Sequence, residues 1–493
     1  MLLCGILCSA ISVVGFYSKT LLFILGIFLA LCFGIAVFKQ INLTLIVALT
    51  VVIVMLISTV ITIGKVEDVE KFTGEIVNCD VAVCEITYKR GDTYRADIEI
   101  IESKNLSENT KLSVWYNDAI LKSGQIVNAN IKLYPSDIKY KASSYSKNIY
   151  LYGNMDDITL TDKKDFVLTA IGETREYIKT TVFNNLDYRE GATLCALIFG
   201  DKQYFTDEFY NNVKSSGVSH VMVVSGLHLS IFVIIFTVFT ERFIYNKYVK
   251  SLGIITTVLL LTALCGFTMS MLRAGMTYVL MALGISIGRK GVAENTLGAA
   301  VSFILIFSPF AVFSIAFQLS VLSTAGILCV ALPVIKTVIS RKLIKNKMLE
   351  KLFSAVVVSL SAYLFTLPVV IYVFGYISVV SIISNLLICY AVTVVLWIAV
   401  IALLCNSLWT GLGKLIFIPC GMVLKYINQV INYMGSLPFA VIYVGKFAFL
   451  ASLISIAIII ALMFACKNWL YMIKLNEITR KQITEGGKTL KWR

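Results

Sequence analysis

The stretch ISVVSIISNLLICYAVTVVLWIAVIAL, from Ile377 to Leu403, contains no charged residue. A helix of this length can cross the hydrocarbon core of a bilayer, which takes roughly 20 apolar residues. The whole chain of 493 residues is 58% hydrophobic and 15% charged, with a mean hydropathy of +0.84. Because so few charged residues cannot cover a soluble globule of this size, we predict an integral membrane protein.

Comparable apolar runs are distributed along the chain, and about twelve of them approach the length of a membrane span. They lie near residues 2–17, 20–38, 41–63, 221–240, 251–266, 268–288, 295–313, 315–335, 352–374, 377–403, 411–433 and 446–466. We predict about three helices in residues 1–64 and about nine in residues 220–466. The first run lacks a basic flank and a cleavage site, so we expect an uncleaved span.

The net charge of +14 is unevenly distributed. Residues 65–220 hold 19 Lys and Arg against 24 Asp and Glu, whereas the rest of the chain holds 24 basic residues against 5 acidic ones. The basic surplus lies in short connections and in residues 467–493, which is the positive-inside pattern of cytoplasmic loops. With Lys39 also inside, we predict an inner-membrane protein with both termini and the basic tail in the cytoplasm and residues 65–220 outside.

Residues 65–164 interrupt the membrane pattern with short runs of β-favouring residues. Val81 to Tyr88 and Thr93 to Ile101 flank a turn at residues 89–92 and predict a hairpin, and strands are also expected at residues 111–116 and 125–134. About five strands in such a segment predict a small extracytoplasmic β-barrel, with an OB-like fold favoured over another β-domain. Residues 165–219 then show helical, amphipathic spacing and are predicted to lie along the outer membrane interface.

Twelve cysteines are scattered through the chain without a CxxC pair, so no zinc site is expected. Cys79 and Cys84 lie in the outer segment, where a disulfide between them is chemically allowed. Five residues apart on one strand, the two side chains would face opposite sides unless the strand bends.

Charged residues in the apolar runs are scarce. Beyond Lys214 the chain has no Asp, and its only acids are Glu241, Glu294, Glu350, Glu477 and Glu485, which we place in cytoplasmic loops or the tail. Carboxylates in spans usually carry protons or sodium ions, so a cation-coupled transporter is disfavoured. Arg273 lies inside a span, where it either extends to the outer interface or lines an aqueous cavity that faces an anion.

The only histidines, His220 and His228, lie where the chain re-enters the membrane. Ser225 and His228 share a helical face, so a serine nucleophile with a histidine base has to be considered. A histidine three residues away rarely reaches the serine productively, and Val223 replaces the first glycine of the G-x-S-x-G elbow. A cavity wall or close helix packing at Gly226 and His228 is the alternative, and we expect neither enzymatic activity nor a bound metal or cofactor.

These residues resemble the ComEC family, the membrane-channel proteins of bacterial natural competence. The resemblance is carried by ALIFGD at residues 196–201, SGVSH at 216–220 and VSGLH at 224–228, and then in order by Gly266, Ser270, Arg273, Ala274, Arg289, Leu297, Pro309, FQLS at 317–320, Ala325, Gly326, Pro368, Phe374 and Asn385. It covers nearly the whole chain and is strongest at residues 185–390. The channel candidates are therefore Asp201, His220, Ser225, Gly226, His228, Arg273, Gln318, Ser320 and Asn385.

The resemblance implies a channel domain that passes single-stranded DNA across the cytoplasmic membrane during natural transformation. Many family members end in a metallo-β-lactamase-like domain, but no H-x-H-x-D-H motif occurs in this sequence, so we expect a separate nuclease. The expected partners are DNA, membrane lipid, a helix-hairpin-helix DNA receptor outside and, because no Walker A motif is present, a helicase-like ATPase inside. Homo-oligomerisation is left open.

Three functions remain to be separated. The leading hypothesis is a passive DNA conduit in which Trp115, Tyr116 and Tyr134 of the β-domain stack on bases. The alternatives are an intramembrane serine hydrolase that uses Ser225 and His228, and an exporter of a small anionic or lipid-linked substrate.

Overall fold

The computed structural model describes residues 2–17, 43–90, 93–103, 106, 108–117, 121–136, 141–222, 224–240, 242, 245–288 and 292–489. The predicted span at 20–38, Lys39 and Arg289 lie outside these residues. The chain forms two compact units. One comprises Met1–Tyr210, His220–Ser320 and Ala391–Asn428, and the other comprises Asn211–Ser219, Val321–Tyr390 and Gln429–Arg493.

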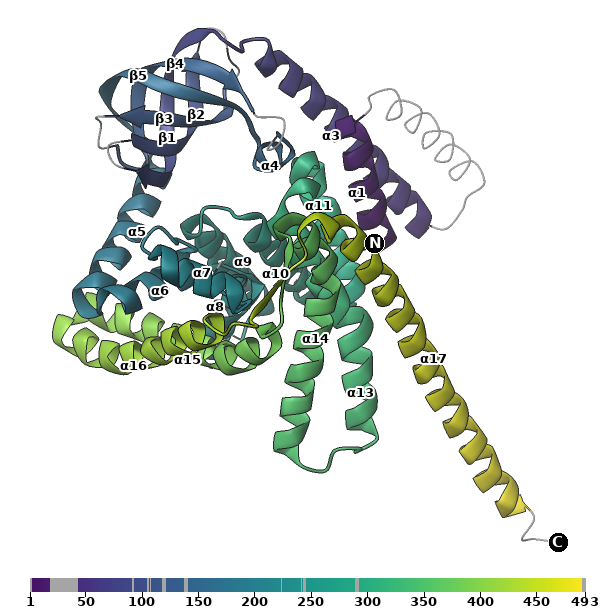
Figure 1. Ribbon diagram of the computed structural model, residues 1–493. Coiled ribbons are helices and arrows are strands. Elements are labelled where there is room, and N and C mark those ends of the chain that lie inside the picture. The colour runs from purple at the N-terminus through teal and green to yellow at the C-terminus, as the bar shows by residue number, and fades with distance from the viewer. Residues whose placement is uncertain are drawn as a thin grey trace. The chain divides into compact units, whose positions relative to one another are not determined.

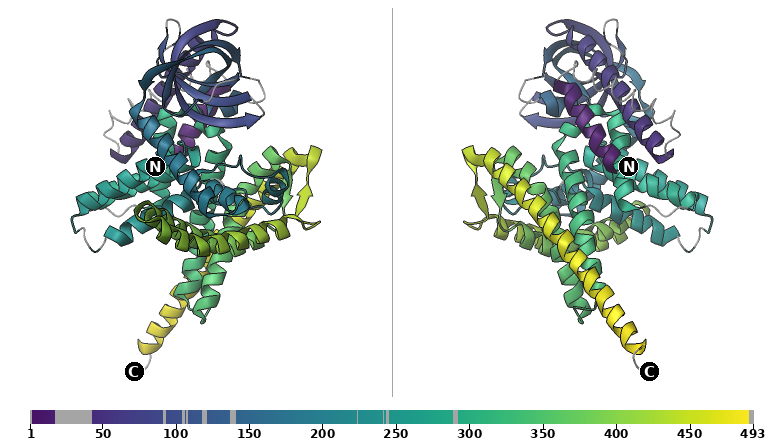
Figure 2. Two further views of the ribbon diagram at one scale, coloured as in Figure 1. Left: turned by 90° about the vertical axis from the view of Figure 1, so that its left-hand side faces the viewer. Right: turned by 90° about the vertical axis from the view of Figure 1, so that its right-hand side faces the viewer.

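Five strands of the first unit close into a barrel in the order β1-β2-β3-β5-β4 (Figure 1). They are β1 (Ile76–Arg90), β2 (Thr93–Ser103), β3 (Lys111–Asn117), β4 (Gln125–Pro135) and β5 (Ile149–Lys164). All neighbours pair antiparallel except β3 and β5, which are parallel. Both views of Figure 2 show these purple and blue strands curving around one axis.

Alternation of side chains along the strands builds the core of the barrel. On β4, Val127, Ala129, Ile131 and Leu133 are all buried, while the residues between them face outward. The predicted hairpin is confirmed, since Arg90 pairs with Thr93 across the turn. The strands predicted at 111–116 and 125–134 are also confirmed, since β3 and β4 cover these residues. On β4 the pattern was informative because side chains of a half-buried strand alternate between the two faces of the sheet.

Helix α5 (Phe166–Asn185) begins directly after the barrel and contacts its base. Asp165 caps the helix by accepting a hydrogen bond from the Leu168 amide at 2.8 Å. Arg175 on α5 forms an ion pair with Glu85 on β1 at 2.8 Å. These contacts fix the barrel against the first helix that follows it in sequence.

Residues 165–219 form three helices, α5, α6 (Tyr188–Phe199) and α7 (Asp207–Ser215). Every residue of α6 from Gly191 to Leu197 is buried. The part of α6 from Gly191 to Leu197 therefore packs inside the protein, whereas Tyr188 and Arg189 of its first turn are exposed, and the interfacial position of residues 165–219 stays a prediction. Small residues such as Ala192 and Ala196 occupy its packed faces.

Most predicted spans coincide with helices of the described residues. In the first unit these are α1 (Leu2–Tyr17), α3 (Leu43–Glu70), α8 (Gly226–Thr240), α9 (Lys247–Leu264), α10 (Met269–Ser286) and α11 (Ala293–Phe307), with the short helices α4 (Lys141–Tyr145) and η1 (Pro309–Phe313) beside them. Among the described residues, eight helices are long and apolar enough to cross a membrane. This criterion does not test the predicted total of about twelve, because α8 and α11 are shorter apolar helices and the predicted span at 20–38 lies outside the described residues.

Helices α12 (Ile315–Gly326), α15 (Ser381–Leu408) and α16 (Thr410–Gly435) contribute residues to both units. The second unit also holds η2 (Ile327–Ala331), α13 (Leu332–Ser340), α14 (Lys347–Phe374) and α17 (Ala448–Thr489). Its two short strands, β6 (Tyr376–Ser378) and β7 (Val441–Tyr443), pair antiparallel. The basic segment predicted as a tail from residue 467 continues α17 as far as Thr489.

The barrel core allows a matched test on one strand. Leu151 of β5 is fully buried, whereas Leu160 of the same strand is 67% exposed. We expect Leu151→Ala to lower the free energy of unfolding of the barrel by about 2–5 kcal/mol, because it leaves a cavity. Leu160→Ala should change it by less than about 0.5 kcal/mol. Urea-dependent proteolysis of the purified full chain, scored by cleavage within residues 76–164, measures both, and equal effects would contradict this packing.

Candidate functional site

Ser225 is the N-cap of α8. Its carbonyl accepts the first helical hydrogen bond, from the Leu229 amide at 3.3 Å, and its Oγ accepts from the Leu227 amide at 3.3 Å. The Ser225 amide in turn donates to Nδ1 of His228 at 3.1 Å. This reciprocal arrangement is a variant of the capping box, in which the serine accepts from the second helical residue and histidine replaces the usual Glu or Gln at the third.

The same geometry brings the Ser225 hydroxyl within 3.1 Å of His228 Nδ1. The two side chains come within hydrogen-bond distance because both close the first turn of the helix, and whether this geometry is productive for catalysis is not tested by the contact. Since Nδ1 accepts an amide hydrogen, the neutral ring carries its proton on Nε2. Nε2 is buried, has no hydrogen-bond partner among the described residues, and receives no orienting carboxylate there.

Arg273 lies on α10 beside this turn and is 9% exposed. Its Nε donates to Oγ of Ser320 on α12 at 2.8 Å, and Oγ of Ser270 lies 3.4 Å from the same oxygen. A Cβ placed on Gly226 would stand 3.1 Å from Nη2 of Arg273. Gly226 therefore leaves the space that the guanidinium occupies, and Arg273 turns toward α8 and α12 without extending to an outer surface.

No acid pairs with Arg273 among the described residues, where the ion pairs join other side chains. The guanidinium has five N–H donors, and the Nε–H is the one that finds an acceptor in this part of the chain. A buried charge without a counterion is costly, so the first turn of α8 and the guanidinium together form a basic, water-poor site.

Asp201 is held in a different cluster, at the end of α6. Its carboxylate accepts from Lys179 Nζ at 2.7 Å and from Gln203 Nε2 at 2.9 Å. Burial alone would lower the pKa of Lys179, but the Asp201 carboxylate outweighs it and raises that pKa above its ordinary value. Asp201 thus fixes the α6–α7 connection to α5 and does not join Arg273.

The remaining channel candidates make contacts of their own, and His220 lies close enough to His228 to interact with it electrostatically. Gln318 donates from Nε2 to the Val312 carbonyl at 2.9 Å, and His220 lies exposed in the turn after α7. Asn385 belongs to the second unit, where its Nδ2 donates to Ser381 Oγ at 3.4 Å. The structure therefore brings together Ser225, Gly226, His228, Arg273 and Ser320, with Ser270 beside them.

The aromatic candidates of the barrel divide by strand parity. Tyr116 points into the core, is 2% exposed and stacks on Tyr94 with ring centroids 5.4 Å apart. Its assignment as a base-stacking residue was therefore wrong. Trp115 and Tyr134 are on the outer side, because adjacent residues of a strand face opposite ways.

The outer face also holds cations and a ring that the sequence pattern did not predict. The Arg95 guanidinium lies 5.5 Å from the Trp115 ring and 5.4 Å from the Tyr152 ring, and Lys132 Nζ lies 5.8 Å from the Tyr134 ring. Pairing places Arg95 beside Trp115 and Tyr152 beside Tyr134. Two cations and three aromatic rings thus lie side by side across four neighbouring strands. We call this set of residues the barrel strip (Arg95, Trp115, Tyr152, Lys132 and Tyr134).

Cys79 and Cys84 are free thiols, so the disulfide considered for them is not formed. Cys79 faces the barrel core, while Cys84 contacts Glu99 on the other side of the strand. Burial raises the pKa of the Cys84 thiol to about 12. The described residues contain no group of three or more His, Cys, Asp or Glu arranged to hold a metal ion.

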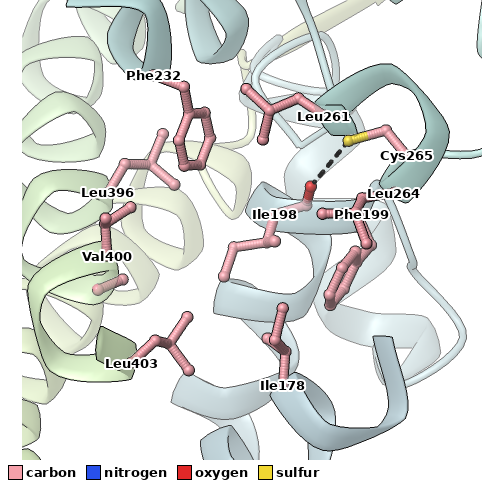
Figure 3. A pocket seen from close by; sticks show the side chains of 11 residues that line it. Ile178, Ile198, Phe199, Phe232, Leu261, Leu264, Cys265, Leu396, Val400 and Leu403 are labelled. Atoms are coloured by element: carbon pink, nitrogen blue, oxygen red, sulfur yellow. Dashed lines mark hydrogen bonds between the residues drawn. The ribbon is translucent and has the colours of Figure 1, made fainter. Parts of the chain in front are cut away.

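A cavity of about 90 Å³ lies among α5, α6, α8, α9 and α15 (Figure 3). Every side chain that lines it is apolar, apart from Cys265, whose thiol donates to the Ile198 carbonyl at 3.4 Å. Such a lining offers no group that could bind a phosphate or a base edge. The cavity is thus distinct in chemistry from the turn that holds Arg273.

The family model of the competence protein matches residues 197–469, more than half of the chain. The chain belongs to the competence protein family. The match contains Ser225, Arg273, Ser320 and Asn385 and leaves out the barrel, and it confirms the resemblance to ComEC proteins. The eight long apolar helices and this membership together identify a membrane protein.

ComE operon protein 3 of Bacillus subtilis (strain 168) is 23% identical to this chain over 343 residues. These residues are 69% of this chain and 43% of that protein, so the chain spans less than half of its relative. No solved structure matches this competence protein.

The capping box predicts how Ser225 responds to substitution. Ser225→Ala should lower the free energy of unfolding by about 1 kcal/mol, because the Leu227 amide loses its acceptor. Ser225→Asn should restore stability, since Asn is also a good N-cap. Thermal unfolding of the purified variants measures both changes. A serine-directed phosphonate should leave the wild-type protein unlabelled, and an adduct that disappears in Ser225→Ala would show that Ser225 is a nucleophile.

Proposed function

We propose that this competence protein takes part in DNA uptake and passes single-stranded DNA across the cytoplasmic membrane as a passive conduit. Family membership and the likeness to ComE operon protein 3 support a role in competence. A polyanion would be repelled by carboxylates along its path, and the polar turn around Arg273 offers it donors instead.

The observation that carries the proposal is the barrel strip. Single-stranded nucleic acid exposes the faces of its bases, which stack on aromatic side chains, while nearby cations attract the phosphates. Arg95 over Trp115 and Lys132 over Tyr134 provide both features on one surface. A duplex hides its base faces, so this surface favours a single strand.

We further propose that the barrel is of the OB type. The closed order β1-β2-β3-β5-β4 and the helix α4 between β4 and β5 support this assignment, although this fold usually carries its helix elsewhere. In OB folds the face of strands 2 and 3 binds oligonucleotides. Arg95 on β2 and Trp115 on β3 belong to that face.

In the cell, the barrel would lie outside the cytoplasmic membrane and both termini inside. The basic connections near Arg242 and Arg341 support this orientation by the positive-inside pattern. The barrel region is slightly acidic overall, so its hold on DNA should be weak and depend on stacking more than on counterion release.

Such a conduit requires other proteins. We propose a helix-hairpin-helix DNA receptor outside, a helicase-like ATPase inside as the motor and a separate nuclease that removes the second strand. Membrane lipid surrounds the spans, and a homo-oligomer remains an option. The protein itself would act without an enzymatic step.

An intramembrane hydrolase and an exporter are the two alternatives to a DNA conduit. The 3.1 Å contact between Ser225 and His228 favours an intramembrane hydrolase, although both side chains already serve the helix cap. An exporter of a small anionic or lipid-linked substrate would use the same basic turn. The barrel strip separates the DNA hypothesis from both, because neither alternative needs base stacking.

Transport can be tested with the purified protein in liposomes. We expect a fluorescent single-stranded oligonucleotide to enter the lumen, and Arg273→Glu to abolish entry because the new carboxylate repels phosphates. The matched control is Arg242→Glu, which makes the same charge change at an exposed position. Flotation confirms membrane insertion of each variant. Entry at the wild-type rate in an inserted Arg273→Glu protein would contradict the proposal.

Stacking on the barrel strip can be tested by oligonucleotide binding. Because a base stacked on an aromatic ring contributes about 1–3 kcal/mol, Trp115→Ala should weaken binding of oligothymidylate about 5- to 150-fold. Tyr177→Ala removes an exposed ring from α5 and serves as the control. Fluorescence anisotropy with the full chain measures both, and equal affinity of the Trp115→Ala and wild-type proteins would reject the barrel strip as a binding surface.

A further inference from the structure

The guanidinium of Arg273 is unusual because it is nine-tenths buried and has no acidic partner among the described residues. Ser320 accepts from Nε and thereby fixes the plane of the group. The two terminal nitrogens, Nη1 and Nη2, remain without a hydrogen-bond acceptor in the described part of the chain. Paired N–H donors of this kind match the oxygens of a phosphate.

The first turn of α8 supplies a second element of a phosphate site. Amides at the start of a helix point along its axis, and the helix dipole places partial positive charge there. Arg273 Nη2 is aimed at this turn, since it occupies the space beside Gly226. A third donor, Nε2 of His228, lies on the same turn and is 1% exposed, without an acceptor among the described residues.

We propose that the Arg273 guanidinium and the first turn of α8 bind one phosphodiester group of single-stranded nucleic acid. This inference rests on the proposed function and assigns the phosphate contact within it. Ser320 acts as a positioning residue for the guanidinium, and Ser225 and His228 hold the turn in shape. Gly226 leaves room for the guanidinium, because a Cβ at this position would stand only 3.1 Å from Nη2 and the arginine side chain would have to shift.

The charge of the site favours a diester. One guanidinium and one helix terminus offer little more than a single positive charge, and each linkage of a DNA strand carries a single negative charge. Neighbouring phosphates of a strand could therefore replace one another at Arg273. A phospholipid headgroup presents the same phosphate chemistry, and the experiment has to separate the two sources.

Arginine footprinting on the wild-type full chain tests the site without any substitution. Phenylglyoxal labels accessible guanidinium groups, and peptide mass spectrometry measures the labelled fraction at Arg273 and at the exposed Arg242. We expect oligothymidylate to lower the labelled fraction of Arg273 at least severalfold and to leave the labelled fraction of Arg242 unchanged. An oligonucleotide with uncharged methylphosphonate linkages should protect neither. Failure of Arg273 to react without DNA, or labelling that DNA does not alter, would overturn the proposal.

A second measurement uses the salt dependence of oligothymidylate binding. Loss of one phosphate contact to a single strand should reduce the slope of log K against log salt by about 0.7. We expect this reduction in Arg273→Gln and a smaller one in Arg242→Gln, with thermal unfolding as a check on folding. Equal slopes for the two variants would reject the site, even if the protein binds DNA elsewhere.

The lipid composition of the membrane distinguishes a nucleic-acid phosphate from a lipid-headgroup phosphate as the ligand of Arg273. The binding measurement is repeated in nanodiscs of phosphatidylcholine with and without phosphatidylglycerol. If the salt slopes of wild type and Arg273→Gln differ equally in both lipid mixtures, the result supports the nucleic-acid phosphodiester. If this difference in slope disappears with phosphatidylglycerol, the site would be assigned to a lipid headgroup. If wild-type protein binds no oligonucleotide under any condition, the proposed function fails as well.

Discussion

The burial of one guanidinium charge without a carboxylate is the constraint around which the polar part of the helical region is organised. Transfer of an unpaired charge out of water is strongly unfavourable, so its surroundings must offer compensation. Ser320 accepts one hydrogen bond from Arg273, and Gly226 removes the side chain that would block the guanidinium. The proposed phosphate would accept from the remaining donors.

The barrel offers a different kind of surface for the proposed ligand, single-stranded DNA. There, the half-buried Arg95 lies over the rings of Trp115 and Tyr152 on the outer side of the barrel, and its Nε donates to Ser113 Oγ at 2.8 Å. The ion pair of Glu85 with Arg175 ties this barrel to α5, and the Asp201 cluster ties α5 to the end of α6. A continuous chain of contacts within the first unit therefore links the exposed surface to the helices that follow.

The sequence predicted features that depend on short-range periodicity. Strands β1 to β4 followed from alternation and turn residues, and most helices followed from apolar length. Tyr116 was misassigned because adjacent residues of a strand face opposite sides of the sheet. The pairing of Tyr116 with Tyr94 on β2 and of Trp115 with Asn154 on β5 fixes which side faces the core. The burial of α6 and the contact of Arg273 with Ser320, 47 positions away, depend on tertiary packing that no local pattern encodes.

The central claim is that the charge of Arg273 is completed by a phosphate of the transported strand. Cryo-electron microscopy of the full-length protein with bound oligothymidylate tests it most directly. The account predicts phosphate density within about 3 Å of the terminal nitrogens of Arg273 and against the first turn of α8. A strand that passes through the protein without approaching Arg273, or a carboxylate found paired with its guanidinium, would contradict the account.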